Sequence, residues 1–378
     1  MKSLWVMAVA LGATLSLPAQ AQDKVKLVDV IELSGAGAAA GTNWKNGADM
    51  AAADINAKGG ILGKPVEIVH YDTQTNPGNT RAAVQRGIDE GAYAILGPIF
   101  SGPIGASMQI SQRAEVAQIV GGEAAGFTKQ GNPYIFRTSL SQTAAMPKIA
   151  KYLKDTVKAG SIAVVWVNND FGKGGRDAIL PELEKAGIKV AVDVSTEQGQ
   201  ADFTADAIKV KNANADAVFV YLNEEESARF LRAAKQQGIT KPMIGETTLL
   251  GAKVLELAGD AANGAKGHVG LSTDAPIPAL QEFGKRYREK YGFASDHNGV
   301  KGYMAVFMVK WATEKQKKLD KKGLADTLRG ATIKASEEPG ILIDTVIEQN
   351  GDLDRESFLA EVVNGKQVIN TTLPRIKP

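Results

Sequence analysis

The chain holds few of the side chains from which catalytic sites are usually built. Cysteine is absent, and the three histidines, His70, His268 and His297, stand far apart in the sequence. Thiol catalysis, thiolate metal sites and disulfides are therefore excluded, and a histidine-based triad or metal centre has little to be built from. We accordingly expect a protein that is not an enzyme and that needs neither a metal nor a cofactor.

One hydroxyl group stands where binding chemistry is favoured. Ser101 lies in residues 97–102 (GPIFSG), between an expected strand and an expected helix. A hydroxyl beside the free backbone N–H groups of a helix start suits a ligand carboxylate. Ser101 could instead serve as the helix N-cap, and the two roles are compatible. We do not expect a nucleophile, because no Gly-x-Ser-x-Gly elbow surrounds this serine.

Polar and aromatic residues follow two expected strands in the second half of the chain. Asn169 and Phe171 come after one of them, which fits either a plain turn or the wall of a binding cleft. Glu246 and Thr247 come after another and offer a carboxylate and a hydroxyl to a ligand amine. Trp44 is ambiguous between a core position and a cleft position, and we include it among the candidates.

The glycine-rich loop at residues 34–41 (SGAGAAAG) lies between an expected strand and an expected helix, as the loop of a dinucleotide-binding site does. Such a site needs an acid about 20 residues after its first glycine. Asp72 comes much later, so we expect no nucleotide cofactor. The loop still suits a polar or anionic ligand, because backbone N–H groups at a helix start are free.

The elements that position these residues alternate between strand and helix. Such tandem units predict an α/β fold with parallel sheets and helices on both faces, and the pattern restarts after about residue 144, which indicates two lobes. In the first block we expect strands at 25–33, 65–71, 93–99 and 118–121 and helices at 42–57 (N-capped by Thr42), 77–90 and 102–112. In the second we expect helices at 144–157, 172–186, 203–212 and 224–237 and strands at 161–167, 189–194, 217–222 and 242–245, followed by helices at 278–290 and 299–314 and hairpin turns at 349–351 and 364–365.

The first 21 residues predict a cleaved signal peptide. Lys2 precedes an apolar run, and Ala19-Gln20-Ala21 forms a small-x-small cleavage site, so the mature chain is expected to begin at Gln22. The run is shorter than the roughly 20 residues that a membrane span needs. With 44 Lys and Arg against 42 Asp and Glu, the net charge of +2 gives no sign of a nucleic-acid partner.

Several motifs spread over the whole mature chain resemble those of the branched-chain amino-acid binding proteins of ABC importers, the leucine/isoleucine/valine-binding-protein family. They are residues 54–64 (DINAKGGILGK), Tyr71-Asp72, Asn76-Pro77, 96–98 (LGP), 136–138 (FRT), 162–165 (IAVV) near Phe171-Gly172, and 233–238 (AAKQQG).

This resemblance implies a type I periplasmic binding protein, with two Rossmann-like lobes joined by a three-segment hinge. Crossings near Ser141, Thr273 and Gly340 would divide the chain into an N-terminal lobe (22–141 plus 274–339) and a C-terminal lobe (142–273 plus 340–378). A ligand in the cleft would favour closure of the hinge. The resemblance further implies a monomer in the periplasm that is not embedded in the membrane, and an inner-membrane ABC permease with its ATPase as partner. A sensor of the same fold that regulates a receptor or kinase is the alternative.

The resemblance also assigns roles at the binding site. Ser101 matches the serine that holds a ligand carboxylate, and Gly122, Glu123 and Ala124 match a segment that supplies a carbonyl and a threonine, here without the threonine. Phe171 falls where an aromatic ring closes the cleft, whereas Asn223 and Ala40 replace other aromatic residues. The amine-binding acid aligns at Thr247, next to Glu246. A disulfide pair of some members maps to Thr75 and Phe100. These departures favour an amino acid or related amide or carboxylate over a leucine-like ligand.

Overall fold

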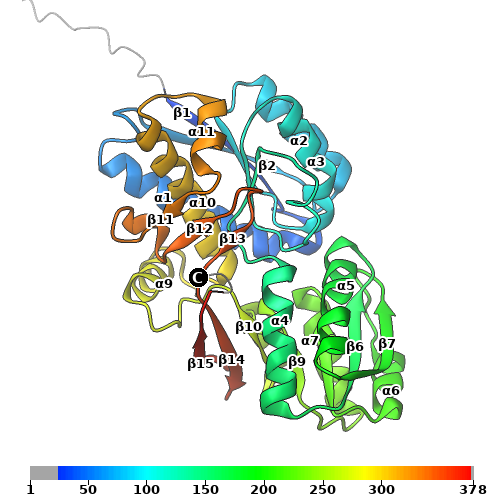
Figure 1. Cartoon of the computed structure of the whole chain (residues 1–378). Helices are drawn as coiled ribbons and strands as arrows, with labels where there is room; N and C mark the ends of the chain where they lie inside the picture. The colour runs from blue at the N-terminus through cyan, green and yellow to red at the C-terminus, as the bar shows by residue number, and fades with distance from the viewer. Residues whose placement is uncertain (1–23, 376–378) are drawn as a thin grey trace, which may run out of the picture.

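The computed structural model describes residues 24–375, so the expected signal peptide and the start at Gln22 lie outside the described residues. The described chain forms two α/β lobes, which lie one above the other in Figure 1. The predicted α/β class is confirmed.

The N-terminal lobe is built on a five-stranded parallel sheet in the order β2-β1-β3-β4-β5. Helices α2 and α3 pack on one face, and α1 and α10 pack on the other. Its strands are β1 (Val25–Ile31), β2 (Val66–Asp72), β3 (Ala94–Leu96), β4 (Gln118–Val120) and β5 (Ile135–Arg137). Its helices are α1 (Ala38–Ala57), α2 (Pro77–Asp89), α3 (Ser101–Arg113), α9 (Pro278–Tyr291), α10 (His297–Gln316) and α11 (Lys321–Leu328).

The C-terminal lobe is built on a seven-stranded sheet in the order β15-β14-β10-β9-β8-β6-β7. Five strands are parallel, and the β14–β15 hairpin joins β10 in antiparallel fashion. Its strands are β6 (Ser161–Val167), β7 (Lys189–Thr196), β8 (Ala217–Tyr221), β9 (Met243–Gly245), β10 (Lys266–Val269), β14 (Ser357–Val363) and β15 (Lys366–Leu373). Its helices are α4 (Gln142–Tyr152), α5 (Asp170–Lys185), α6 (Thr204–Ala213), α7 (Glu224–Gln236) and α8 (Ala252–Ala258).

The parallel parts of the two sheets share one topology. In each, the second strand of the chain lies outside the first and the third lies on the other side, so the strand order reverses between β1 and β3 and again between β6 and β8. Ligands of open α/β sheets bind beyond the carboxyl ends of the strands at such a reversal. The loops after these strands are therefore the places to look for a site.

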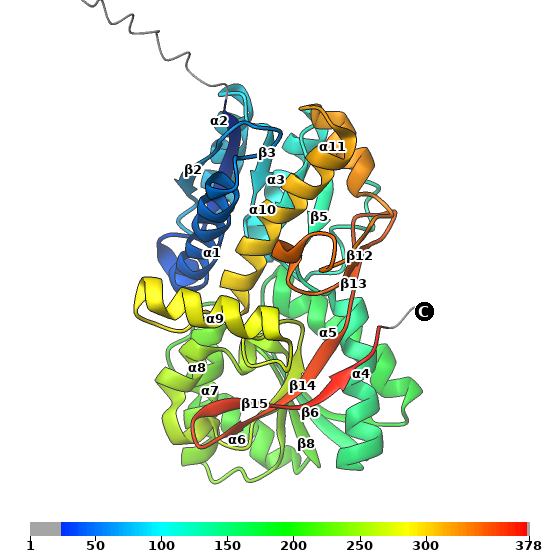
Figure 2. The same ribbon diagram turned by 90° about the vertical axis from the view of Figure 1, so that its left-hand side faces the viewer.

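Helices α1 and α10 pack backbone to backbone, and glycine makes this packing sterically feasible. A Cβ at Gly302 would lie 2.2 Å from the carbonyl oxygen of Trp44, and one at Gly47 would lie 1.9 Å from that of Gly299. The close approach holds the first turns of α10 beside the carboxyl ends of the N-lobe strands (Figure 2).

Helix α1 itself begins at Ala38, so the predicted cap at Thr42 is wrong and Thr42 lies inside the helix.

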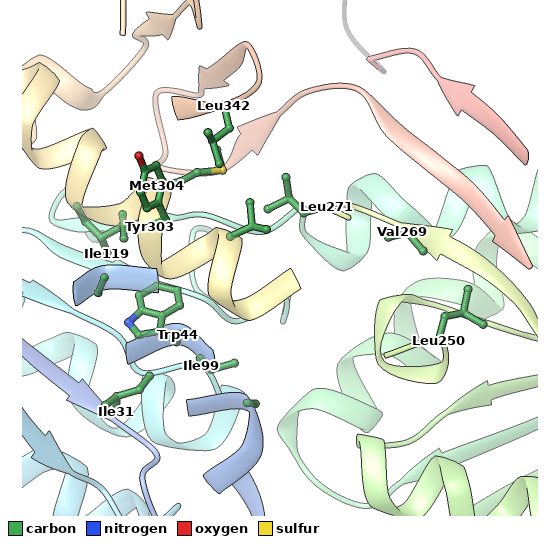
Figure 3. Close-up of a cluster of buried hydrophobic side chains, with 14 of the residues drawn as sticks. Ile31, Trp44, Ile99, Ile119, Leu250, Val269, Leu271, Tyr303, Met304 and Leu342 are labelled. Atoms are coloured by element: carbon green, nitrogen blue, oxygen red, sulfur yellow. The ribbon is translucent and has the colours of Figure 1, made fainter. Parts of the chain in front are cut away.

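A large hydrophobic cluster underlies both lobes near their junction. Figure 3 follows it from Ile31 and Trp44 through Met304 to Leu271 and Val269. Trp44 is fully buried there, and its indole N–H donates to Asp29 Oδ1 at 2.9 Å. Its satisfied N–H and complete burial make Trp44 a core residue.

Three short segments connect the lobes, and two of them touch. A small sheet joins β11 (Thr332–Ile333), β12 (Thr345–Ile347) and β13 (Leu353–Asp354), which lie on both sides of the crossing expected near Gly340. This pairing favours a third crossing at residues 355–356, immediately before β14, and the lobe boundaries stay a prediction. Arg355 is fully buried in that segment, where its Nη2 donates to the carbonyl of Thr138 in the first connection at 2.8 Å.

Candidate functional site

A cavity of about 110 Å³ lies between the lobes at the carboxyl ends of their strands. Its volume is several times the ~10–15 Å³ that one water molecule needs. Both lobes and helix α10 contribute to its wall. The lining residues are Thr75, Pro77, Ile99, Phe100, Ser101, Gly102, Pro103, Gly121, Gly122, Glu123, Asn169, Phe171, Gln198, Asn223, Glu224, Thr248, His297, Asn298 and Lys301.

Ser101 stands at the first turn of α3 with its hydroxyl buried and without a hydrogen-bond partner. The loop before it is fixed by Glu32, whose two carboxylate oxygens accept the backbone N–H groups of Ile99 and Phe100 at 3.1 and 3.0 Å. Complete burial raises the pKa of Glu32 to about 7 despite these two donors. A hydroxyl and a helix start are thus presented together, with the hydroxyl free for a ligand.

Glu123 and Lys301 form a buried ion pair at the floor of the cavity. Lys301 Nζ lies 3.0 Å from Glu123 Oε1 and donates to the carbonyl of Gly121 at 3.2 Å. The second carboxyl oxygen of Glu123, Oε2, has no donor near it. Burial, together with the charge of Glu246, raises the pKa of Glu123 to about 7, although Lys301 opposes both effects.

Glu246 faces Glu123 from the other lobe, but its oxygens are already engaged. Oε2 accepts the backbone N–H of Thr247 at 2.7 Å, and Oε1 lies 2.9 Å from Nδ1 of His268. Burial lowers the pKa of His268 to about 3, so the ring is neutral at pH 7. In the tautomer with hydrogen on Nδ1, the ring donates to the carboxylate of Glu246. The same burial raises the pKa of Glu246.

Two buried side chains hold the segment that carries Glu123. Arg137 donates to the carbonyls of Gly122 and Ala124 at 2.9 and 2.6 Å and pairs with Asp352 at 3.1 Å. Gln142, at the start of α4, accepts the N–H of Ala125 through Oε1. Its Nε2 donates to the carbonyl of Phe171 at 2.8 Å, so it joins this segment to the opposite lobe.

Three side chains of the C-lobe wall already have partners, whereas the hydroxyl of Thr248 in the same wall is buried without one. Asn169 Oδ1 caps α5 by accepting the N–H of Gly172 at 2.9 Å. The Phe171 ring stacks on Tyr221 with a centroid distance of 4.3 Å. Asn223 Nδ2 donates to Glu226 at 3.3 Å.

The structure brings six of the sequence candidates to the cavity and leaves four away from it. Those in the wall are Ser101, Gly122, Glu123, Asn169, Phe171 and Asn223. Ala124 and Glu246 lie behind the wall, whereas Thr247 faces a separate surface hollow. Trp44 is fully buried in the core and does not line the cavity, so the structure gives no support to a ligand contact by its ring. Ligand contact by the others stays a prediction.

Sequence reasoning missed Lys301, Asn298, Gln142 and Glu32. A lysine in the middle of an apolar helix face and an acid directly after the first strand were the available signals, because such residues are almost never buried without a partner. Asn298 and Gln142 carry no comparable signal, since both depend on where helices begin.

Two α/β lobes with a buried polar cleft between them define a hinged binding protein. Among residues 24–375, no base is hydrogen-bonded to the hydroxyl of Ser101 in this cleft. Over the same residues, no helix has the length and apolarity needed to cross a bilayer.

Comparison with known proteins agrees with this class. A family model described as periplasmic binding protein matches residues 24–367, and the chain therefore belongs to that family, whose members are substrate-binding proteins and not enzymes. It is 28% identical over 265 residues to the Leu/Ile/Val/Thr-binding protein of Salmonella typhimurium, covering 70% of this chain and 72% of the relative.

Two solved structures show the same fold with different bound ligands. One is the branched-chain amino acid transporter substrate binding protein from Streptococcus pneumoniae in complex with isoleucine, with a TM-score of 0.84, 24% identity and coverage of 94% and 100% of the two chains. The other is an ABC transporter solute-binding protein from Rhodopseudomonas palustris with 3,4-dihydroxybenzoic acid, with a TM-score of 0.84, 21% identity and coverage of 94% and 98%. These likenesses confirm the type I periplasmic binding protein fold.

Proposed function

We propose that this chain is the periplasmic substrate-binding component of an ABC importer and that it binds an amino acid or a closely related amide or carboxylate by hinge closure. One observation carries the proposal. Both lobes line one cavity whose wall includes the residues of four buried polar atoms without partners, Ser101 Oγ, Glu123 Oε2, Thr248 Oγ1 and Asn298 Oδ1. Buried polar groups are almost always satisfied, so unsatisfied ones around a shared cavity are typical of a ligand-binding site.

The polar character of the wall argues against a purely aliphatic ligand. Asn169, Gln198, Asn223 and Glu224 line the cavity together with Phe171. An aliphatic side chain beside these groups would remove water from them and offer no hydrogen bond in return, which costs free energy. A ligand with a polar side chain avoids that cost. The amino-acid class agrees with the relatives, and an inner-membrane permease with its ATPase is the expected recipient.

A melting-temperature screen of the exported protein tests the proposal. The panel contains the common amino acids, small amides and aromatic acids, with bound solute first removed by unfolding and refolding. A true ligand raises apparent stability with the logarithm of its concentration over Kd, by about 2.7 kcal/mol at a hundredfold excess. Small-angle scattering should then show compaction with that ligand. Tight binding without compaction would contradict the hinge, and no binding by any compound would contradict the proposed ligand classes.

A further inference from the structure

The two buried acids at the floor of the cavity, Glu123 and Glu246, differ in how many of their carboxyl oxygens have hydrogen-bond donors. One carboxyl oxygen of Glu246 accepts the N–H of Thr247 and the other is hydrogen-bonded to His268. Glu246 does not line the cavity. Glu123 does line the cavity, and its Oε2 has no donor. When Glu123 is protonated, the two acids also hydrogen-bond to each other across the lobes. Of these two acids, only Glu123 lines the cavity and has a carboxyl oxygen without a donor when it is ionised.

Resting on the proposed function, we propose that Glu123 binds the ammonium group of the ligand, that its presence makes an ammonium group obligatory, and that Glu246 does not fill this role. Lys301 is the positioning residue, because it holds Oε1 of Glu123 at 3.0 Å and so leaves Oε2 free for the ligand. The arrangement places the amine acceptor on the same lobe as Ser101. Both polar ends of an amino acid are then held before the lobes close.

The charges around Glu123 explain why an amine-free acid should be rejected. The groups that face it are Lys301 from α10, Glu246 after β9, Tyr221 on β8, His268 on β10, Arg137 on β5 and Arg355 before β14. Lys301 alone forms an ion pair with it. A carboxylate ligand at Ser101 without an ammonium group would add a third negative charge near Glu123 and Glu246 and bring no cation. An ammonium group supplies that cation directly.

The proton on Glu123 competes with the ligand. Because burial and Glu246 raise the pKa of Glu123 to about 7, the empty cleft holds this carboxyl protonated below that pH. An ammonium group must displace the proton, so the affinity for an amino acid should fall about tenfold for each pH unit below 7. Amine-free carboxylates displace no proton and should not weaken as the pH falls.

The test compares amino acids with their deaminated analogues by calorimetry. The pairs are valine with isovalerate, asparagine with succinamate and phenylalanine with hydrocinnamate, and benzoate is added as an aromatic acid. The wild-type protein is compared with Glu123→Gln and with the matched control Glu246→Gln. We expect Glu123→Gln to lower amino-acid affinity roughly ten- to hundredfold and to abolish the pH dependence. Glu246→Gln should retain the preference for the amine-bearing member of each pair.

Each outcome decides one of the two proposals. If Glu246→Gln abolishes the amine preference while Glu123→Gln retains it, the assignment is overturned. If the wild-type protein binds deaminated analogues or benzoate as well as it binds amino acids, the inference fails and the proposed binding function stands. If no compound binds, both fail for these ligand classes. The comparison of each amino acid with its deaminated analogue needs only the wild-type protein, so it tests the inference even if a variant does not fold.

Discussion

Glu123 and Glu246 follow the fourth strand of their respective parallel sheets, yet their surroundings have diverged. Glu246 is held by its own lobe through Thr247 and His268. Glu123 is held on one side by Lys301 and left open on the other. The same difference extends to the rest of the cleft. The N-lobe wall contains three unsatisfied polar atoms, on Ser101, Glu123 and Asn298, against one, on Thr248, in the C-lobe wall. The comparison supports the proposal that the N lobe makes most of the polar contacts to the ligand and that the C lobe closes over it.

The largest effect should come from removing the support of the N-lobe wall. Arg137 is fully buried, and Arg137→Met would leave two carbonyls and Asp352 without their donor. We expect the free energy of unfolding to fall by about 3–5 kcal/mol, measured by urea denaturation without ligand. Arg176→Met in the C lobe removes a partly exposed pair with Asp193 and should cost less than about 1 kcal/mol. Equal losses would show that the two walls are supported alike.

The next largest effect should be the pH dependence that Glu32, which supports the N-lobe wall, gives to the free energy of unfolding. The pKa of Glu32 is raised from 4.5 to about 7, so the folded state holds this proton more tightly than the unfolded state. The resulting stability is fully present below pH 4.5 and is lost as the pH rises through 7, a loss on the order of 3 kcal/mol. Glu32→Gln should remove about this much of the pH dependence, whereas the contributions of Glu123 and Glu224, whose pKa values burial also raises to about 7, should remain. The substitution also weakens one bond to the loop before Ser101. Chemical denaturation measures the free energy of unfolding of both proteins between pH 5 and pH 8. If it depends on pH in Glu32→Gln as strongly as in the wild-type protein, Glu32 is not the source of that dependence.

A matched pair of variants, one in each wall, then tests which wall contributes more to ligand affinity. Ser101→Ala removes a hydroxyl that has no partner in the empty cleft, so it should leave the free energy of unfolding unchanged. It should weaken binding of the ligand found in the melting screen by about 1–3 kcal/mol. Asn169→Ala removes the cap of α5 and should lower stability by about 0.5–2 kcal/mol. The comparison between walls would break if Ser101→Ala lowered stability and Asn169→Ala accounted for the larger loss of affinity.

The smallest effect is expected at the aromatic residue of the closing lobe. Phe171→Leu removes a ring stacked on Tyr221 but keeps an apolar side chain at the cavity. The loss should be about 0.5–1.5 kcal/mol, divided between stability and binding. Calorimetry and denaturation of the same variant measure the two parts. A loss of binding larger than that of Ser101→Ala would mean that the C lobe reads the ligand as well.

The sequence predicted the architecture better than it predicted the site. Alternating strand and helix patterns gave the two parallel sheets, and the turns at 349–351 and 364–365 are confirmed as hairpin connections by β12–β13 and β14–β15. Strands β5 and β10 and helices α8 and α11 went unpredicted, because they are short and carry weak periodicity.

At the site, the strand-end rule found Ser101, Asn169 and Phe171, because a loop after a strand is recognisable along the chain. Lys301 could not be found in this way. Its place beside Glu123 depends on the close packing of α10 on α1, which brings residues distant in sequence together. Whether Glu123 or Glu246 keeps a free oxygen also depends on His268, and no local pattern predicts that contact.

The hydrogen bond from Arg355 to the carbonyl of Thr138 has a mechanical consequence. This bond joins two of the segments that connect the lobes, so neither segment can move independently of the other while the bond is intact. Sliding of one lobe past the other would have to break this buried bond from a charged donor, whereas rotation about an axis through the bond would leave it intact. In the proposed closure, this bond would therefore favour rotation of the lobes over sliding.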